Sequence, residues 1–141
     1  MTMSDKCACV IAVYSIKGGV GKTTTVLQFA VHLAELGKKV LCIDMDSQGN
    51  LTKSFNAAKE LSPRPGEDTV RGIYEIFKEG AALDDIVRET SFDELSGNNI
   101  DFIPAGWKFR DNDLARELCR DEGMALLRFD DVWGKNLNYA G

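Results

Sequence analysis

Apolar runs alternate with helical stripes along the first part of this chain. Residues 9–14 are largely apolar, and a second apolar run covers residues 40–43. Between them, residues 23–36 carry apolar side chains at helical spacing, and Gly37 follows where helices usually end. A strand that is apolar on both faces is typical of a parallel sheet covered on both sides. The pattern therefore predicts a strand over residues 9–14, a helix over residues 23–36 and a strand over residues 39–44.

The rest of the chain continues this alternation. Apolar residues recur at helical spacing after Thr69, which predicts a helix from that residue. The other predicted elements are, in chain order, a short helix within residues 50–56, a loop at 62–66, a short strand at 86–89, a turn at 98–99, a strand at 100–104 and helices at 112–120 and 124–133. Such alternation predicts an α/β fold, a parallel sheet flanked by helices, with ligands bound at the carboxyl ends of the strands. We expect a single domain over residues 1–141.

A glycine-rich segment, residues 16–24, joins the first predicted strand to the first predicted helix. This order of strand, glycine loop and helix is the context that a phosphate-binding loop requires. Glycines let successive backbone N–H groups surround an anion, and the helix dipole adds positive potential. Lys22 can reach the β- and γ-phosphates, and the hydroxyl of Thr23 can ligate the Mg²⁺ that bridges them. The expected ligand is a nucleoside triphosphate, and the predicted phosphate-binding residues are Gly18, Gly19, Val20, Gly21, Lys22, Thr23 and Thr24.

A second polar segment, residues 44–52, follows the second predicted strand. We expect it at the same edge of the sheet as the glycine-rich segment, because the first strand delivers that loop there. Its two carboxylates, Asp44 and Asp46, can attract Mg²⁺ through water and orient a water molecule toward the γ-phosphate. On these residues alone, an acidic loop that simply closes a strand is an equally good interpretation.

The composition favours a globular domain in a reducing compartment. The 141 residues are 44% hydrophobic and 28% charged, which is enough for one core. The net charge is −5 and Lys and Arg form no run, so the chain is not expected to coat nucleic acid. No stretch approaches the ~18 apolar residues of a membrane helix. The four cysteines lack zinc-ligand spacing, which indicates free thiols and predicts a cytoplasmic protein.

The glycine-rich segment departs from the common pattern G-x-x-x-x-G-K-[ST], because the first glycine would fall at Ile16. Instead, Lys17 precedes the glycines. The segment thereby resembles the deviant Walker A motif, K-G-G-x-G-K-T, of the partition and positioning ATPases related to ParA, Soj and MinD. Residues 44–52 resemble the D-x-D-P-Q-G-N-x-T segment of that family, with Ser47 in place of proline. Residues 101–105 resemble one of its strand ends more weakly.

This resemblance implies roles for individual residues. Lys17 would cross a dimer interface, touch the phosphates bound to the partner subunit and so take part in catalysis. Asp46 would act in hydrolysis, and Asp44 would support the metal together with Thr23. The implied cofactors are ATP and Mg²⁺, and the choice of ATP over other nucleotides rests on the resemblance alone. The implied function is plasmid or chromosome segregation by an ATP-dependent homodimer with a ParB-like activator protein, without direct contact of this acidic chain to DNA or to a membrane.

Family members also carry a third motif, an apolar strand that ends in Asp-x-Pro-Pro. No part of the chain after Pro104 matches it. We therefore expect the sheet to lack its C-terminal strands, ATP hydrolysis to be weak or absent, and the uncovered sheet edge to promote self-association. Two other functions remain open, namely a metabolic enzyme of the cobyrinate amidase or dethiobiotin synthetase type, and a non-catalytic nucleotide-binding remnant. Residues 46–50 favour the partition ATPase over the metabolic enzyme.

Overall fold

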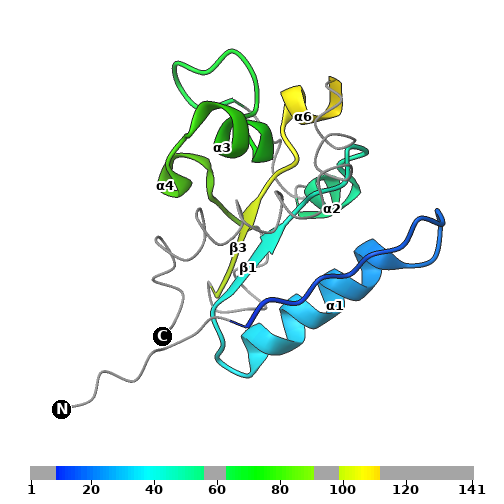
Figure 1. The fold of residues 1–141 in the computed structure, drawn as a ribbon. Coiled ribbons are helices and arrows are strands. Elements are labelled where there is room, and N and C mark those ends of the chain that lie inside the picture. The colour runs from blue at the N-terminus through cyan, green and yellow to red at the C-terminus, as the bar shows by residue number, and fades with distance from the viewer. Residues whose placement is uncertain (1–8, 56–62, 91–98, 112–141) are drawn as a thin grey trace.

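The computed structural model describes residues 9–55, 63–90 and 99–111, and Figure 1 shows their helices and strands. The elements are, in chain order, α1 (Lys22–Glu35), β1 (Val40–Ile43), α2 (Asn50–Phe55), α3 (Ile73–Glu79), α4 (Leu83–Ile86), β2 (Arg88–Glu89), β3 (Ile100–Ile103) and α6 (Trp107–Asp111). The helices predicted at residues 112–120 and 124–133 lie outside the described residues. No helix within the described ranges is long and apolar enough to cross a membrane.

The described strands form one sheet in the order β1-β3-β2. β1 and β3 are parallel, with Val40 opposite Ile100 and Ile43 opposite Ile103. β2 pairs with β3 in the antiparallel direction. A parallel connection needs a crossover of about a dozen residues or more, and the stretch from residue 90 to residue 99 is shorter than that. The predicted α/β fold is confirmed, and its short edge strand β2 is antiparallel to the other two strands.

Helices cover both faces of this sheet. On one face α1 and α2 pack against the strands through a buried apolar cluster: Ala30, Ala34, Cys42, Leu51, Phe55, Ile100 and Phe102. On the other face α3, α4 and α6 pack through a second cluster: Ile73, Ile76, Leu83, Ile86, Ile103, Ala105 and Phe109. Neighbouring residues of β3 belong to different clusters, because successive side chains of a strand point to opposite faces. β1 and β3 therefore contribute apolar side chains to both faces of the sheet, whereas β2 consists of Arg88 and Glu89.

The strand predicted over residues 9–14 is not formed among the described residues. Figure 1 shows this segment as a dark blue trace outside the arrows of the sheet. Its side chains face solvent, with exposed fractions of 75% for Val10, 59% for Ile11 and 77% for Tyr14. Within the described residues, the order β1-β3-β2 leaves one edge of β1 unpaired, and residues 9–14 do not pair with that edge. An apolar sequence favours burial, but a strand forms only when the segment also lies against a strand edge that offers hydrogen bonds.

The segment before α3 lies beside the end of β3. The N–H group of Ile73 donates a hydrogen bond of 3.1 Å to the carbonyl oxygen of Pro104. The N–H group of Trp107 donates one of 3.0 Å to the carbonyl oxygen of Val70. Because Val70 is used in this pairing, the helix predicted from Thr69 begins only at Ile73.

Helices α4 and α6 were not predicted from the sequence. α4 takes up Ile86, so the strand predicted over residues 86–89 is reduced to Arg88–Glu89. Leu83 and Ile86 are both buried, and their spacing of three residues suits one turn of helix as well as a strand end. α6 begins at Trp107, directly after the pairing with Val70. Short apolar segments of this kind do not distinguish helix from strand by pattern alone.

Two glycines allow the segment before α3 and the end of β3 to approach each other. A Cβ atom built on Gly72 would lie 2.3 Å from the carbonyl oxygen of Pro104 and 2.6 Å from the nitrogen of Gly106. A Cβ atom built on Gly106 would lie 2.8 Å from the nitrogen of Gly72. The atoms that such a Cβ would meet are main-chain atoms at both positions. Neither position therefore has room for a side chain unless the main chain moves.

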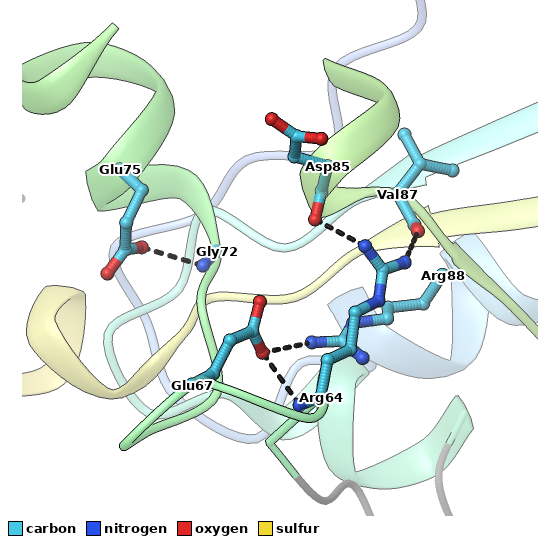
Figure 2. Close-up of polar contacts among 7 residues, drawn as sticks. All are labelled: Arg64, Glu67, Gly72, Glu75, Asp85, Val87 and Arg88. Carbon is cyan, nitrogen blue, oxygen red and sulfur yellow. Dashed lines mark hydrogen bonds and ion pairs between the residues drawn. The ribbon is translucent and has the colours of Figure 1, made fainter. Parts of the chain in front are cut away.

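An arginine and glutamate network holds the loop before α3 to the end of α4 (Figure 2). The guanidinium of Arg64 donates hydrogen bonds of 2.5 Å and 2.6 Å to the carbonyl oxygens of Asp85 and Val87. The backbone N–H of Arg64 and the guanidinium of Arg88 both donate to Oε2 of Glu67, at 2.8 Å and 3.1 Å. Partial burial alone would raise the pKa of Glu67, but the hydrogen bond from Arg64 and the charge of Arg88 outweigh it and lower the pKa. The loop is thus fixed to the face of the sheet opposite α1.

Candidate phosphate-binding site

The glycine-rich loop curls directly into the start of α1. Gly19 and Gly21 have φ angles of 72° and 86°, a region that L side chains rarely adopt, so these two positions favour glycine. Gly21 is the N-cap of α1, and no side chain caps the helix. The first N–H groups of a helix have no partner within it, so those of Lys22, Thr23 and Thr24 are oriented toward an external acceptor. The turn predicted from the glycine spacing is confirmed.

The positive charges of this loop meet no acidic residue in the first turn of α1. The ammonium of Lys22 folds back over the loop, with its Nζ 3.4 Å from the carbonyl oxygen of Lys17. The side chain of Lys17 is exposed, and its backbone N–H donates to the hydroxyl of Ser15 at 3.2 Å. Two lysines and a helix N-terminus thus produce a positive potential at one exposed turn. An anion such as a phosphate fits this arrangement.

Asp44 lies at the end of β1 and is 2% exposed. Its Oδ1 accepts a hydrogen bond of 3.1 Å from the N–H of Asp46. Its Oδ2 accepts two bonds from Thr52, one of 2.7 Å from the backbone N–H and one of 2.5 Å from the hydroxyl. Burial raises the pKa of Asp44 above its ordinary value, and the hydrogen bonds from Thr52 and Asp46 offset part of that rise. The carboxylate is therefore held by the chain itself, and a contact to Mg²⁺ through water would preserve these bonds.

Asp46 stands at the outer turn of the acidic loop and is half-buried. Its Oδ1 accepts a hydrogen bond of 2.9 Å from the N–H of Gln48. Its carbonyl oxygen accepts one of 2.8 Å from the N–H of Gly49, whose φ of 61° completes the turn into α2. An aspartate that binds backbone N–H groups ahead of it is typical of a tight turn. Among the residues that the structure describes, Oδ2 of Asp46 accepts no hydrogen bond, so it is available to a water molecule or a ligand shell.

The glycine-rich loop and the acidic loop lie toward the same end of the sheet. Figure 1 shows α1 running opposite to β1, so that the loop before α1 and the loop after β1 share one end. α1 packs against both β1 and α2, which fixes the two loops relative to each other. In the part of the chain that the structure describes, no hydrogen bond or ion pair links residues 17–24 to residues 44–49. The structure brings the predicted site residues to one edge without joining them directly.

Two residues of this site lie within the segments identified from the sequence, but no role was predicted for them. Thr52 bonds Asp44 through its backbone and hydroxyl, and the hydroxyl also accepts a hydrogen bond of 3.0 Å from the N–H of Ala105. The available signal was a threonine in the first turn of α2. The segment between Asp44 and this helix is short, so Thr52 lies close to the end of β1. Ala105 contributes only a backbone N–H group, which leaves no trace in the choice of side chain.

The donor atoms at this edge suit Mg²⁺ better than a softer metal. Thr23 offers a half-buried hydroxyl at the start of α1, and Asp44 and Asp46 offer carboxylate oxygens. Mg²⁺ prefers oxygen ligands and is usually held by one or two protein groups together with substrate phosphates. Among residues 9–55, 63–90 and 99–111, no three His, Cys, Asp or Glu side chains gather as a metal centre would require. Cys42 is buried, and burial raises the pKa of its thiol to about 12.

A glycine loop that opens a helix, an acidic turn at the same edge, and a sheet covered on both faces define a P-loop nucleotide-binding domain. A family model described as an AAA domain matches residues 8–128 of the chain. The chain belongs to this family, that of the ParA- and Soj-type P-loop ATPases.

Individual relatives agree with this assignment. The chain is 36% identical over 121 residues to the chromosome-partitioning ATPase Soj of Thermus thermophilus, covering 85% of this chain and 44% of that protein. It is 38% identical over 96 residues to the sporulation initiation inhibitor protein Soj of Bacillus subtilis, covering 68% of this chain and 33% of that protein. A crystal structure of a plasmid partition protein from Borrelia burgdorferi matches with a TM-score of 0.51 and 36% identity, over 65% of this chain and 36% of that one. The chain thus spans less than half the length of these relatives.

Proposed function

We propose that this chain binds ATP together with Mg²⁺ at residues 17–24 and acts as a cytoplasmic partition-type ATPase module. The observation that carries the proposal is the loop geometry. Gly19 and Gly21 hold the left-handed turn, Lys22 folds over it, and the first turn of α1 has neither an acidic residue nor a side-chain cap. Two relatives named as Soj, one of them a chromosome-partitioning ATPase, support ATP as the nucleotide and partition as the process.

Each residue of the proposed site has a distinct role. Lys22 would contact the β- and γ-phosphates, and Thr23 would ligate Mg²⁺, which would neutralise charge on those phosphates. Gly18, Gly19, Val20 and Gly21 would contribute backbone N–H groups, and Thr24 would cap the phosphates. Asp46 would orient the attacking water through its open Oδ2, and Asp44 would support the metal through water.

Calorimetric titration of the 141-residue chain with ATP and with ADP, each with and without Mg²⁺, tests this proposal. We expect binding of ATP that strengthens when Mg²⁺ is present, because the metal screens the charge between neighbouring phosphates. Absence of ATP binding under both conditions would overturn the proposal. Hydrolysis is expected to be slow, since residues 105–141 contain no Asp-x-Pro-Pro segment to assist the metal and the water.

Self-association is a second part of the proposed function. Val10, Ile11, Tyr14 and Ile16 are all more than half exposed, in a segment with no strand partner among the described residues. Exposed apolar chain with open backbone groups favours contact with another chain. We expect light scattering at high concentration to give a mass above the 15.5 kDa of one chain. A monodisperse monomer would contradict this part of the proposal.

Replacing Lys17 with alanine tests the dimer contact that the family resemblance implies. The side chain of Lys17 is exposed and makes no hydrogen bond or ion pair within the described residues, so it is available to a partner subunit. We expect the affinity for ATP with Mg²⁺ to stay within about threefold, and the ATP-driven rise in scattering mass to be lost. The exposed Lys38, beyond the opposite end of α1, provides the matched Lys38→Ala control. An unchanged ATP-driven association in Lys17→Ala would exclude the role across the dimer.

Activation by a ParB-like protein completes the proposal. The relatives that support it are the chromosome-partitioning ATPase Soj of Thermus thermophilus and the plasmid partition protein of Borrelia burgdorferi. The net charge of −5 makes a direct grip on DNA by this chain unfavourable, so the partner would connect it to its cargo.

A further inference from the structure

We propose that Thr52 is a positioning residue, which fixes the acidic loop of residues 44–49 against β3 and thereby holds Asp46 at the phosphate site. The inference rests on the proposed function for its catalytic meaning, but the contacts that carry it belong to the fold. Thr52 is 8% exposed, and its hydroxyl both donates and accepts a hydrogen bond. It donates to Oδ2 of Asp44 and accepts from the N–H of Ala105.

These contacts close residues 44–52 into a ring. The backbone N–H of Asp44 donates to the carbonyl oxygen of Ile103 at 3.0 Å, so one end of the ring belongs to the sheet. The side chain of Asp44 then bonds Thr52, which is part of α2, so the other end returns to the same point. Asp46 and Gln48 lie between these two anchors along the chain. Both ends of the segment that carries Asp46 are therefore fixed, one to the sheet through Asp44 and the other to α2 through Thr52.

The bond to Ala105 attaches the ring to the segment that follows β3. Ala105 is 1% exposed, and its N–H has the hydroxyl of Thr52 as its acceptor. Pro104 and Trp107 on either side bond the segment before α3. A displacement of Asp44 and Thr52 together, the base of the ring, away from β3 would break the bond between Thr52 and Ala105 and leave a buried N–H without an acceptor. This cost favours a single position of the loop.

The proposal requires the hydrogen bonds of the Thr52 hydroxyl, and not only a side chain that fills the same volume. Thr52→Val keeps the volume and the backbone N–H bond to Asp44 but removes both hydrogen bonds of the hydroxyl. Thr52→Ser keeps both hydrogen bonds and loses one methyl group. Thr90→Val is the matched control, because Thr90 is 2% exposed and its hydroxyl has no hydrogen-bond partner among the described residues. The three variants separate positioning from a general effect of altering a buried threonine.

Amide hydrogen exchange of the chain without nucleotide tests the positioning directly. The N–H groups of Asp46, Gln48 and Gly49 are bonded within the loop, to Asp44 Oδ1, Asp46 Oδ1 and the Asp46 carbonyl. In Thr52→Val we expect these amides to exchange at least about tenfold faster than in the wild type, relative to the amides of α3. Thr52→Ser and Thr90→Val should stay within about threefold. Equal exchange in wild type and Thr52→Val, or equal acceleration in Val and Ser, would overturn the inference.

The gain in ATP affinity on adding Mg²⁺ tests the catalytic meaning. We expect Thr52→Val to reduce this gain by about tenfold while leaving the affinity for ATP without Mg²⁺ unchanged, because Asp44 and Asp46 act on the metal side. Thr52→Ser should restore the gain. A full gain in Thr52→Val would overturn the link to the site. If the wild-type chain binds no ATP, the proposed function fails, whereas the exchange measurement still decides whether Thr52 positions the loop.

Discussion

Lys22→Ala is expected to lower the affinity for ATP with Mg²⁺ by at least about a hundredfold. The ammonium of Lys22 lies over the glycine loop, 3.4 Å from the carbonyl oxygen of Lys17, which places its charge where phosphates would bind. A hydrogen bond to a charged group contributes about 1.5–3 kcal/mol, and Lys22 would contact two phosphates. A loss of about 3 kcal/mol corresponds to roughly a hundredfold in the dissociation constant. No other cation of this loop is placed to substitute, since Lys17 points into solvent.

Calorimetric titration compares Lys22→Ala with wild type and with Lys38→Ala. Lys38 is exposed and lies beyond the C-terminal end of α1, so its removal changes the net charge equally without approaching the loop. The far-ultraviolet circular dichroism of Lys22→Ala should match that of wild type, because within the described residues this ammonium makes a single hydrogen bond, which is exposed and lies within the loop. If Lys22→Ala binds ATP within threefold of the wild type, the nucleotide does not use this loop.

Gly72→Ala is expected to lower the free energy of unfolding by about 3 kcal/mol or more. The φ of Gly72 is −161°, an extended conformation open to any residue, so the cost comes from lack of space alone. The added Cβ would lie 2.3 Å from the Pro104 oxygen, which is backbone and cannot rotate away. The segment before α3 must then separate from β3, which strains the bonds that join Ile73 to Pro104 and Trp107 to Val70. Stabilities of small domains are about 5–15 kcal/mol, so this single methyl group removes a large share.

Urea unfolding followed by circular dichroism measures this effect. Gly66→Ala is the control, because Gly66 has a φ of 88° but a Cβ there meets nothing within 4 Å. That control isolates the conformational penalty of a left-handed residue, about 1–2 kcal/mol. A midpoint for Gly72→Ala at or above that of Gly66→Ala would show that the two segments are not in the close contact described here.

Four elements of the fold were predicted well from the sequence, because the periodicity of their apolar residues is clear. α1, α2, β1 and β3 all lie within the predicted ranges, to within one residue at each end. Each has an apolar pattern of one clear period and a glycine, proline or polar residue at its boundary. Residues 9–14 have an equally clear pattern and form no strand among the described residues, because the pattern reports the preference for burial, whereas pairing depends on where the fold places the segment relative to a sheet edge.

The candidate site was predictable to the extent that its chemistry is local. The glycine loop is local, since Gly19, Gly21 and Lys22 lie together in sequence and shape one turn. The environment of Asp44 is not local. Its burial depends on Thr52, and the position of Thr52 depends on a backbone N–H of Ala105 at the end of another strand. A sequence shows which carboxylates are present, but the tertiary fold determines which groups donate hydrogen bonds to them.

The burial of Cys42 has a practical consequence for labelling. Its thiol lies in the core between α1 and the sheet, and with a pKa of about 12 it contributes almost no thiolate at neutral pH. Cys9, in contrast, is an exposed free cysteine at the start of the uncovered apolar segment. Of these two cysteines, a maleimide dye would therefore attach at Cys9. A fluorophore at that position would report, by its emission, the moment at which another chain covers the segment.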